Sequence, residues 1–146
     1  ALLSAEQAIT RSVSDTIIVR FSGIYGPGRL ALIAGVQKGV GKPPSPKRWT
    51  NRIHSEDCAG FLTNLIRQKI AGASLEALYI GSDNEPVTQH DIRVWLAQKL
   101  GVTLVEEAIS KNTSSPPNRR FDNKRLRKSG YKLQYATFRE GYIPLL

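Results

Sequence analysis

The feature that most constrains this chain is a nearly continuous apolar run over residues 16–21, rich in β-branched side chains. Such a run is typical of a strand that is buried on both faces in a parallel sheet. A helical pattern over residues 1–11 precedes it, and a glycine-rich loop over residues 22–29 follows it. Helix, short connection and buried strand form half of a βαβ unit. The loop is therefore expected at the carboxyl end of a parallel strand, where open α/β sheets bind ligands.

The rest of the chain alternates helical and extended patterns. The expected elements are helices over residues 30–38, 55–69, 89–100 and 122–129, strands over residues 75–80 and 102–109, a short extended piece over residues 48–53, and loops over residues 39–46 and 111–117. Thr88 and Thr137 are expected to cap the helical segments that follow them. The strands over residues 16–21 and 75–80 should be parallel neighbours in one sheet, flanked by the 55–69 helix. The residues expected to form the buried face of that helix are Ala59, Leu62, Leu65 and Ile66.

The composition is that of a globular protein, with 40% hydrophobic and 23% charged residues. No apolar run approaches the ~20 residues that a membrane-spanning helix needs, so no membrane association is expected. The single cysteine, Cys58, excludes an internal disulfide framework and favours a reducing, cytoplasmic location. Cys58, His54 and His90 lack the spacing of metal ligands, so no metal site is expected.

The net charge of +9 is concentrated in one segment. Residues 111–139 contain nine Lys and Arg against one acid, Asp122. A basic surface attracts phosphate-bearing partners, from nucleotides to nucleic acids. A basic nucleic-acid-binding module is therefore one candidate function, although the sequence has no helix-turn-helix, KH or RRM signature, and we do not expect nucleic acid to be the partner. The alternative is a solvated basic face.

Four passages, in order along the chain, resemble the extended short-chain dehydrogenases/reductases, the NAD-dependent epimerase/dehydratase family. They are VRFSGIYGPGR (residues 19–29), NRIHSEDCAGFL (51–62), YIGSDNEPVTQHDIRVWLAQKLG (79–101) and NKRLRKSGYKLQYATFREGY (123–142). The resemblance implies an α/β fold: the carboxyl-terminal part of a doubly wound, Rossmann-like parallel sheet with a small α/β substrate-binding lobe. Residues 1–40 would end the dinucleotide-binding domain. Residues 41–146 would form most of the lobe, with residues 55–80 returning to the main sheet.

The family's catalytic Tyr-x-x-x-Lys pair and its glycine-rich cofactor fingerprint do not occur in this sequence. The resemblance implies that both lie in an amino-terminal half preceding Ala1, so this chain holds no catalytic residue and is expected to be inactive alone. The whole enzyme would use NAD or NADP to act as an epimerase, dehydratase or reductase on a sugar nucleotide or a related hydroxyl or carbonyl substrate. Its expected partners are that small molecule, the missing half and further copies of itself. A non-enzymatic scaffold with the same fold is the remaining alternative.

The resemblance also assigns roles to individual residues. Those expected at the nicotinamide end of the cofactor are Phe21, Ser22 and Gly23, and those expected to bind substrate are Tyr25, Arg48, Arg52, Arg119 and Arg120. His54 and Asp57 are expected to be structural, with Asp57 capping the helix that follows. The sequence departs from the family at three places. Phe21 replaces a proline, Gly23 replaces the usual asparagine or small residue, and Thr50 replaces an arginine that grips the substrate diphosphate in nucleotide-sugar epimerases.

Overall fold

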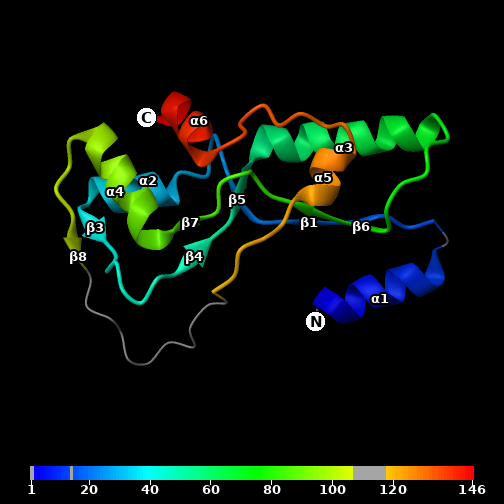
Figure 1. Ribbon diagram of the computed structural model, residues 1–146, viewed down its shortest axis with the longest axis horizontal. Helices are drawn as coiled ribbons and strands as arrows, with labels where there is room; N and C mark the ends of the chain where they lie inside the picture. Colours follow the sequence, from blue (N-terminus) through cyan, green and yellow to red (C-terminus); the bar gives the residue numbers. More distant parts are fainter. Residues whose placement is uncertain (1, 14, 107–117) are drawn as a thin grey trace.

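The computed structural model describes residues 2–13, 15–106 and 118–146, and helices and short strands alternate through them (Figure 1). The helices are α1 (Leu2–Ser12), α2 (Ala31–Gln37), α3 (Ser55–Ile70), α4 (Gln89–Leu100), α5 (Lys124–Lys128), α6 (Phe138–Tyr142) and the 3₁₀ turn η1 (Ile143–Leu145). The strands are β1 (Ile18–Phe21), β2 (Gly23–Tyr25), β3 (Val40–Gly41), β4 (Trp49–Thr50), β5 (Arg52–His54), β6 (Leu78–Gly81), β7 (Val87–Thr88) and β8 (Val105–Glu106). Within these residues, no helix combines the length and the apolar character needed to cross a membrane.

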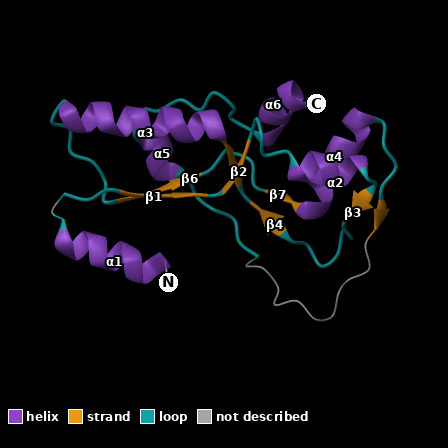
Figure 2. Cartoon of the chain, turned by 180° about the vertical axis from the view of Figure 1, so that it is seen from behind, coloured by secondary structure: helices purple, strands orange, loops and turns teal. Residues whose placement is uncertain are grey.

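The predicted parallel pairing of the two apolar strands is confirmed. β1 pairs with β6 in parallel, with Ile18 opposite Leu78 and Phe21 opposite Gly81. The pair lies between α3 and α1 (Figures 1 and 2). On the α3 side, Phe61 packs edge-on against Tyr79, with the ring centroids 5.4 Å apart. The α/β architecture expected from the sequence is therefore the one observed.

The buried face of α3 differs from the expected one. Its buried residues are Asp57, Cys58, Phe61 and Leu65. Of the residues expected there, Leu62 and Ile66 have 41% and 59% of their surface exposed, and Ala59 is exposed as well. The helix is rotated so that Phe61 and Leu65 meet the sheet, while Asp57 meets the carboxyl-terminal segment. Helical periodicity indicates that an apolar stripe exists, whereas the neighbouring elements decide which edge of it is covered.

A second core joins α2, α4 and α6. Its buried residues are Tyr25, Ile33, Val36, Val87, Ile92, Leu96, Ala97, Phe138 and Tyr142. The start and the end of α4 follow the sequence prediction: Thr88 accepts a hydrogen bond from the Asp91 N–H, and Gly101 ends the helix in the left-handed region at φ 67°. Strand pairs β2–β5 (parallel) and β4–β7 (antiparallel) connect this core to the β1–β6 pair.

Three local predictions need correction. The segment over residues 39–46 is not entirely loop, because β3 within it pairs with β8. Of the strand expected over residues 102–109, β8 is the part that forms within the described residues, and the loop expected over residues 111–117 lies outside them. Thr137 precedes α6 without a side-chain capping bond. Instead, the Glu140 carboxylate accepts from the Ala136 N–H at 2.8 Å, so the helix supplies that acceptor from within its own first turn.

Candidate functional site

The carboxyl ends of β1 and β6 meet the start of β5 at one place. The Ser22 N–H donates to the Gly81 carbonyl at 2.8 Å, which joins the ends of β1 and β6. The Asp83 N–H donates to the Arg52 carbonyl at 2.8 Å, which joins the end of β6 to β5. Ligands of open α/β sheets bind outside the carboxyl ends of the strands. This junction is therefore a candidate ligand-binding site.

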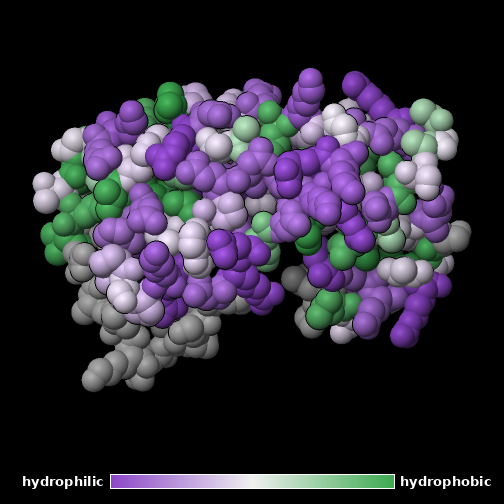
Figure 3. All heavy atoms as spheres, viewed as in Figure 1, coloured by the Kyte–Doolittle hydropathy of each residue, from purple (hydrophilic) through white to green (hydrophobic). Residues whose placement is uncertain are grey.

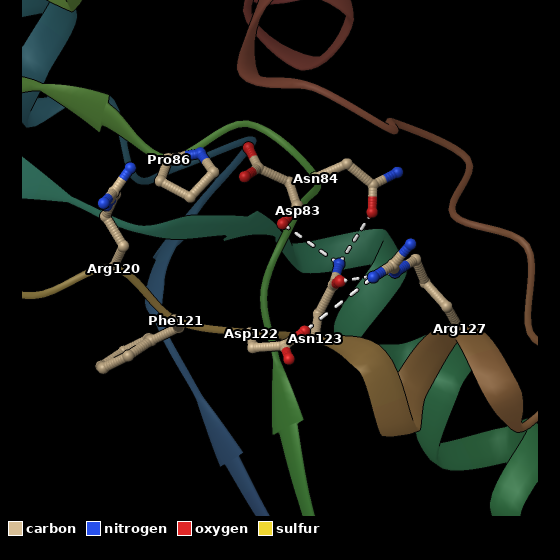
Figure 4. Close-up of a pocket in the computed structure, with 8 residues that line it drawn as sticks. All are labelled: Asp83, Asn84, Pro86, Arg120, Phe121, Asp122, Asn123 and Arg127. Carbon is tan, nitrogen blue, oxygen red and sulfur yellow. Dashed lines mark hydrogen bonds and ion pairs between the residues drawn. The ribbon is translucent and has the colours of Figure 1, made fainter.

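Asn123 fixes the loop that follows β6. Its side chain is buried, and its Nδ2 donates to the carbonyls of Ser82 (2.8 Å) and Asp83 (3.1 Å) and to Asn84 Oδ1 (2.8 Å). Its Oδ1 accepts from Arg127 Nε at 2.9 Å (Figure 4). One amide thus ties the β6 loop to α5, 40 residues further along the chain. The side chains around this loop are held in place by that connection.

A pocket of about 620 Å³ opens beside this loop. The residues that line it are Asp83, Asn84, Pro86, Arg120, Phe121, Asp122, Asn123 and Arg127 (Figure 4). The volume lies within the ~300–1,000 Å³ that is usual for small-molecule sites. Hydrophilic residues cover the face over α5 (Figure 3). The lining is polar and contains two arginines, whose planar donor groups match carboxylate and phosphate oxygens.

The two arginines of the pocket are held differently. Arg127 pairs with Asp122, with Nη2 and Oδ1 3.9 Å apart, in addition to its bond with Asn123. Arg120 lies over the Trp49 ring, with its guanidinium carbon 4.9 Å from the ring centroid. A stacked guanidinium keeps its N–H groups available at its edges. Arg120 can therefore still donate to an anion that enters the pocket.

Asp83 is the buried acid of the pocket, with 2% of its surface exposed. Burial raises its pKa to about 7, against the opposing effects of the Glu85 N–H and the Arg52 charge. Oδ1 accepts from the Glu85 N–H at 3.2 Å, and Oδ2 has no hydrogen-bond partner among the described residues. Near neutral pH this carboxyl can either hold a proton or accept one.

Comparison with known proteins gives one informative result. No protein-family model matches the sequence, and a search of curated proteins finds no match. Among solved structures, a protein of Methylobacillus flagellatus described as an NAD-dependent epimerase/dehydratase shares 39% sequence identity at TM-score 0.79; the match covers 98% of this chain and 50% of that chain. The chain belongs to the NAD-dependent epimerase/dehydratase family. The resemblance found in the four sequence passages is thereby confirmed.

Two further structures share the fold of this epimerase/dehydratase chain. A conserved protein of unknown function from Silicibacter pomeroyi has 27% identity at TM-score 0.72, over 92% of this chain and 50% of that chain. The human epimerase family protein SDR39U1, solved with NADPH, has 17% identity at TM-score 0.74, over 96% of this chain and 52% of that chain. The chain therefore spans about half the length of the structures it matches.

Two of the residues expected to bind substrate lie in the interior of the epimerase/dehydratase chain. Tyr25 is 4% exposed and stacks on Tyr142, with ring centroids 4.3 Å apart. Arg52 is 7% exposed, and its Nη2 donates to Thr50 Oγ1 at 2.7 Å. Burial lowers the pKa of Arg52 and raises that of Tyr25. The packing of both residues places them behind the pocket, on the side of the α2–α4–α6 core.

The other expected substrate residues lie nearer the pocket. Arg120 lines it, and Arg119 is exposed beside it, with its carbonyl accepting from Asn51 Nδ2 at 2.8 Å. Arg48 is half-buried just before β4, and its carbonyl accepts from the Gln89 N–H at 2.8 Å. The structure therefore brings the 118–121 segment against residues 47–51. Asn118 bonds the Lys47 carbonyl and the Trp49 N–H, on either side of Arg48.

The helix-capping role expected for Asp57 is wrong. His54 is the N-cap of α3, and its Nδ1 accepts from the Glu56 N–H at 3.3 Å. The Asp57 carboxylate instead accepts from the N–H groups of Gln134 (2.7 Å) and Tyr135 (3.0 Å) and from the Tyr131 hydroxyl (3.0 Å). Asp57 lies one turn too far into the helix to cap it, and a segment distant in sequence uses its acceptor capacity.

The residues expected near the cofactor lie at the end of β1. Phe21 covers Gly81 so closely that a Cβ added there would lie 2.3 Å from the ring. The Ser22 hydroxyl is buried without a hydrogen-bond partner among the described residues, and Gly23 is exposed, with its N–H donating to the Asn51 carbonyl at 3.1 Å. The backbone at Gly23 is exposed to a ligand edge, whereas the Ser22 hydroxyl beside it is enclosed.

Three residues of the site were missed by the sequence reasoning. Asp83, Asn123 and Arg127 were not singled out, although Asp83 follows a predicted buried strand and that position was a usable signal. Asn123 and Arg127 carried no such signal, because their contacts depend on the approach of α5. No three His, Cys, Asp or Glu side chains gather at a possible metal site within the part of the chain that the structure describes.

Proposed function

We propose that this chain is the carboxyl-terminal half of an NAD(P)-dependent epimerase, dehydratase or reductase that acts on a sugar nucleotide or a related hydroxyl or carbonyl substrate. The observation that carries the proposal is the 39% identity to the Methylobacillus flagellatus protein over 98% of this chain. Residues 1–40 would complete the dinucleotide-binding domain. Residues 41–146 would supply most of the substrate-binding lobe, with residues 55–80 returning to the main sheet.

The polar pocket is the proposed substrate site. Arg120 and Arg127 would bind the phosphate oxygens of a nucleotide, because guanidinium forks form paired charge-assisted hydrogen bonds with them. Asp83 lines the pocket with its carboxyl buried, so its unpartnered Oδ2 would accept from a substrate hydroxyl once the side chain turns toward the pocket. Phe121, which is 37% exposed at the pocket wall, offers an apolar surface to a ring of the ligand. Arginine, carboxyl and aromatic ring together match the three chemical parts of a sugar nucleotide.

The cofactor would lie at the end of β1, beside Ser22 and held by the backbone at Gly23. NAD or NADP would supply hydride transfer when bound. Support for the choice comes from the family of the Methylobacillus flagellatus protein, which is NAD-dependent, and from the NADPH of the human protein. The contribution of this chain would be to orient the substrate from the opposite side, with Asp83 holding or releasing a proton at Oδ2.

The chain alone would be inactive, because its sequence contains neither the Tyr-x-x-x-Lys pair nor the glycine fingerprint of the family. An intact enzyme of this kind would need the remaining half of the fold and would assemble as a homo-oligomer. The single cysteine favours the cytoplasm as its location.

Titration of UDP into the purified chain tests the substrate site. Trp49 fluorescence should report binding, because Arg120 lies on its ring. Arg120→Ala and Arg127→Ala should each weaken UDP binding by about tenfold. Arg125→Ala is the matched control, since Arg125 pairs with Glu76 away from the pocket and should leave binding unchanged. Absence of UDP binding, or equal weakening by all three variants, would count against the site.

A further inference from the structure

Two buried side chains of opposite charge lie next to each other behind the pocket. Arg52, on β5, is 7% exposed, and Asp83, in the loop after β6, is 2% exposed. Their backbones are joined, because the Asp83 N–H donates to the Arg52 carbonyl at 2.8 Å. Arg52 Nη1 and Asp83 Oδ2 are both enclosed, and neither has a hydrogen-bond partner among the described residues. Buried polar atoms are nearly always hydrogen-bonded, so both atoms need a partner.

A third enclosed atom belongs to the same group. Tyr25 lies opposite His54 in the parallel β2–β5 pair, and Arg52 lies two residues before His54. Side chains two residues apart along a strand share a face, so Tyr25 and Arg52 lie on one face of this pair. Helix α6 covers that face: the Arg52 guanidinium lies over the Phe138 ring. The Tyr25 ring stacks on Tyr142, and its hydroxyl is buried without a partner in the described part of the chain.

These three groups offer both donors and acceptors. The guanidinium of Arg52 only donates, an ionised Asp83 only accepts, and the Tyr25 hydroxyl does both. An anion in this space would be repelled by Asp83, and a cation would be repelled by Arg52. Water both donates and accepts, and a buried water typically makes about three hydrogen bonds to groups of this kind. Water therefore fits the chemistry of the three groups.

We propose that ordered water joins Arg52 Nη1, Asp83 Oδ2 and the Tyr25 hydroxyl into one buried network, in which Arg52 is the positioning residue that holds the Asp83 carboxyl turned inward. Figure 4 shows this carboxyl pointing away from Asn123 and Arg127 of the pocket wall. The inference rests on the proposed function, in which Asp83 turns toward the pocket to meet a substrate hydroxyl. It adds which residue opposes that turn.

Arg52 also influences the charge of Asp83. Burial raises the pKa of Asp83 to about 7, and the positive charge of Arg52 opposes that rise. Removing Arg52 should therefore leave the proton more tightly bound at Asp83. The other ionisable groups around Asp83 are Tyr25 on β2, Asp57 on α3, Tyr142 on α6, Glu85 in the same loop, and Arg120, Asp122 and Arg127 in the pocket wall. An Arg52 variant leaves all of these groups in the chain, so a change in proton affinity reports the loss of Arg52.

Carboxyl NMR titration of the purified chain measures the proton affinity of Asp83. Arg52→Met should make Asp83 bind its proton at least about tenfold more tightly, because it removes the opposing charge. Arg52→Lys keeps a positive charge and should stay within about threefold of the wild type. Arg139→Met is the matched control, because the Arg139 guanidinium also lies over the Phe138 ring but pairs with Glu85 at the surface. It should likewise change the proton affinity of Asp83 by less than about threefold.

A high-resolution crystal structure of the wild-type chain gives a second readout that needs no variant. It should show a water hydrogen-bonded to both Arg52 Nη1 and Asp83 Oδ2. The proposal would be overturned if no water joined these two atoms, or if Asp83 had the same proton affinity in the Arg52→Met chain as in the wild type. A change of the same size in the Arg139→Met or Arg52→Lys chain would also overturn it. Neither measurement uses substrate, so failure here is distinct from failure of the UDP titration.

Discussion

Replacing Asp57 by asparagine tests the main contact between α3 and the carboxyl-terminal segment. The buried carboxylate receives three hydrogen bonds: from Gln134 N–H and the Tyr131 hydroxyl at Oδ1, and from Tyr135 N–H at Oδ2. Asparagine keeps one acceptor oxygen and places an NH₂ group against one of the donors. Leaving one buried N–H unsatisfied costs about 1–3 kcal/mol, and the retained bonds lose their charge assistance. Asp57→Asn should therefore lower the free energy of unfolding by roughly 2–4 kcal/mol.

Urea unfolding followed by circular dichroism measures this change. With an m-value of about 2 kcal/mol per molar, in the middle of the range for small proteins, the midpoint should fall by roughly 1–2 M. Asp122→Asn is the control, because Asp122 is exposed, accepts one backbone N–H, from Lys124, and forms one exposed 3.9 Å ion pair, with Arg127. It should change the free energy of unfolding by less than about 0.5 kcal/mol. Equal midpoints for the two variants would refute the argument that Asp57 joins the two segments.

Three other predictions follow from burial. Gly141→Ala would place a Cβ 1.9 Å from the Tyr25 hydroxyl, whose ring is stacked on Tyr142, so unfolding in urea should show a loss of about 1–3 kcal/mol; an unchanged midpoint would mean that Tyr25 can move aside. The pKa of Asp83 is raised to about 7, so the folded state binds the proton more tightly than the unfolded state does. The free energy of unfolding should therefore fall as the pH rises from about 4 through 7. Asp83→Asn should remove this pH dependence, and an identical dependence in the variant would contradict the prediction. Burial raises the pKa of Cys58 to about 11, so its thiol should react with a disulfide reagent at pH 8 much more slowly than free cysteine does. Unfolding the chain should restore the normal rate. Rapid labelling of the folded chain would contradict the prediction.

Several elements could be predicted because their signals are local. The N-cap at Thr88 and the left-handed Gly101 define α4 from residues within or next to the helix. The parallel pairing of β1 and β6 followed from two apolar runs of the right length and composition. The family could also be recognised, because the four passages match its residue pattern in the same order along nearly the whole chain.

The site itself was only partly predictable. Arg120 was expected near the substrate and does line the pocket, yet its neighbours Asn123 and Arg127 gave no sequence signal. Tyr25 follows a glycine-rich motif in the sequence, but packing against Tyr142 buries it. Motif position indicates where a residue lies along the backbone. It does not indicate whether the side chain faces a pocket or a core.

The sequence alone determined the α/β class, the main helices and the parallel strand pair, because capping residues and apolar runs act over a few neighbouring positions. Only the tertiary structure decided the rotation of α3, the role of Asp57 and the pKa of Asp83. Asp57 binds backbone groups 77 and 78 residues away, and the pKa of Asp83 is raised by burial in the folded chain. Such effects depend on which distant segments pack together. That packing is a property of the whole fold, since each helix can present any of several faces until its neighbours are in place.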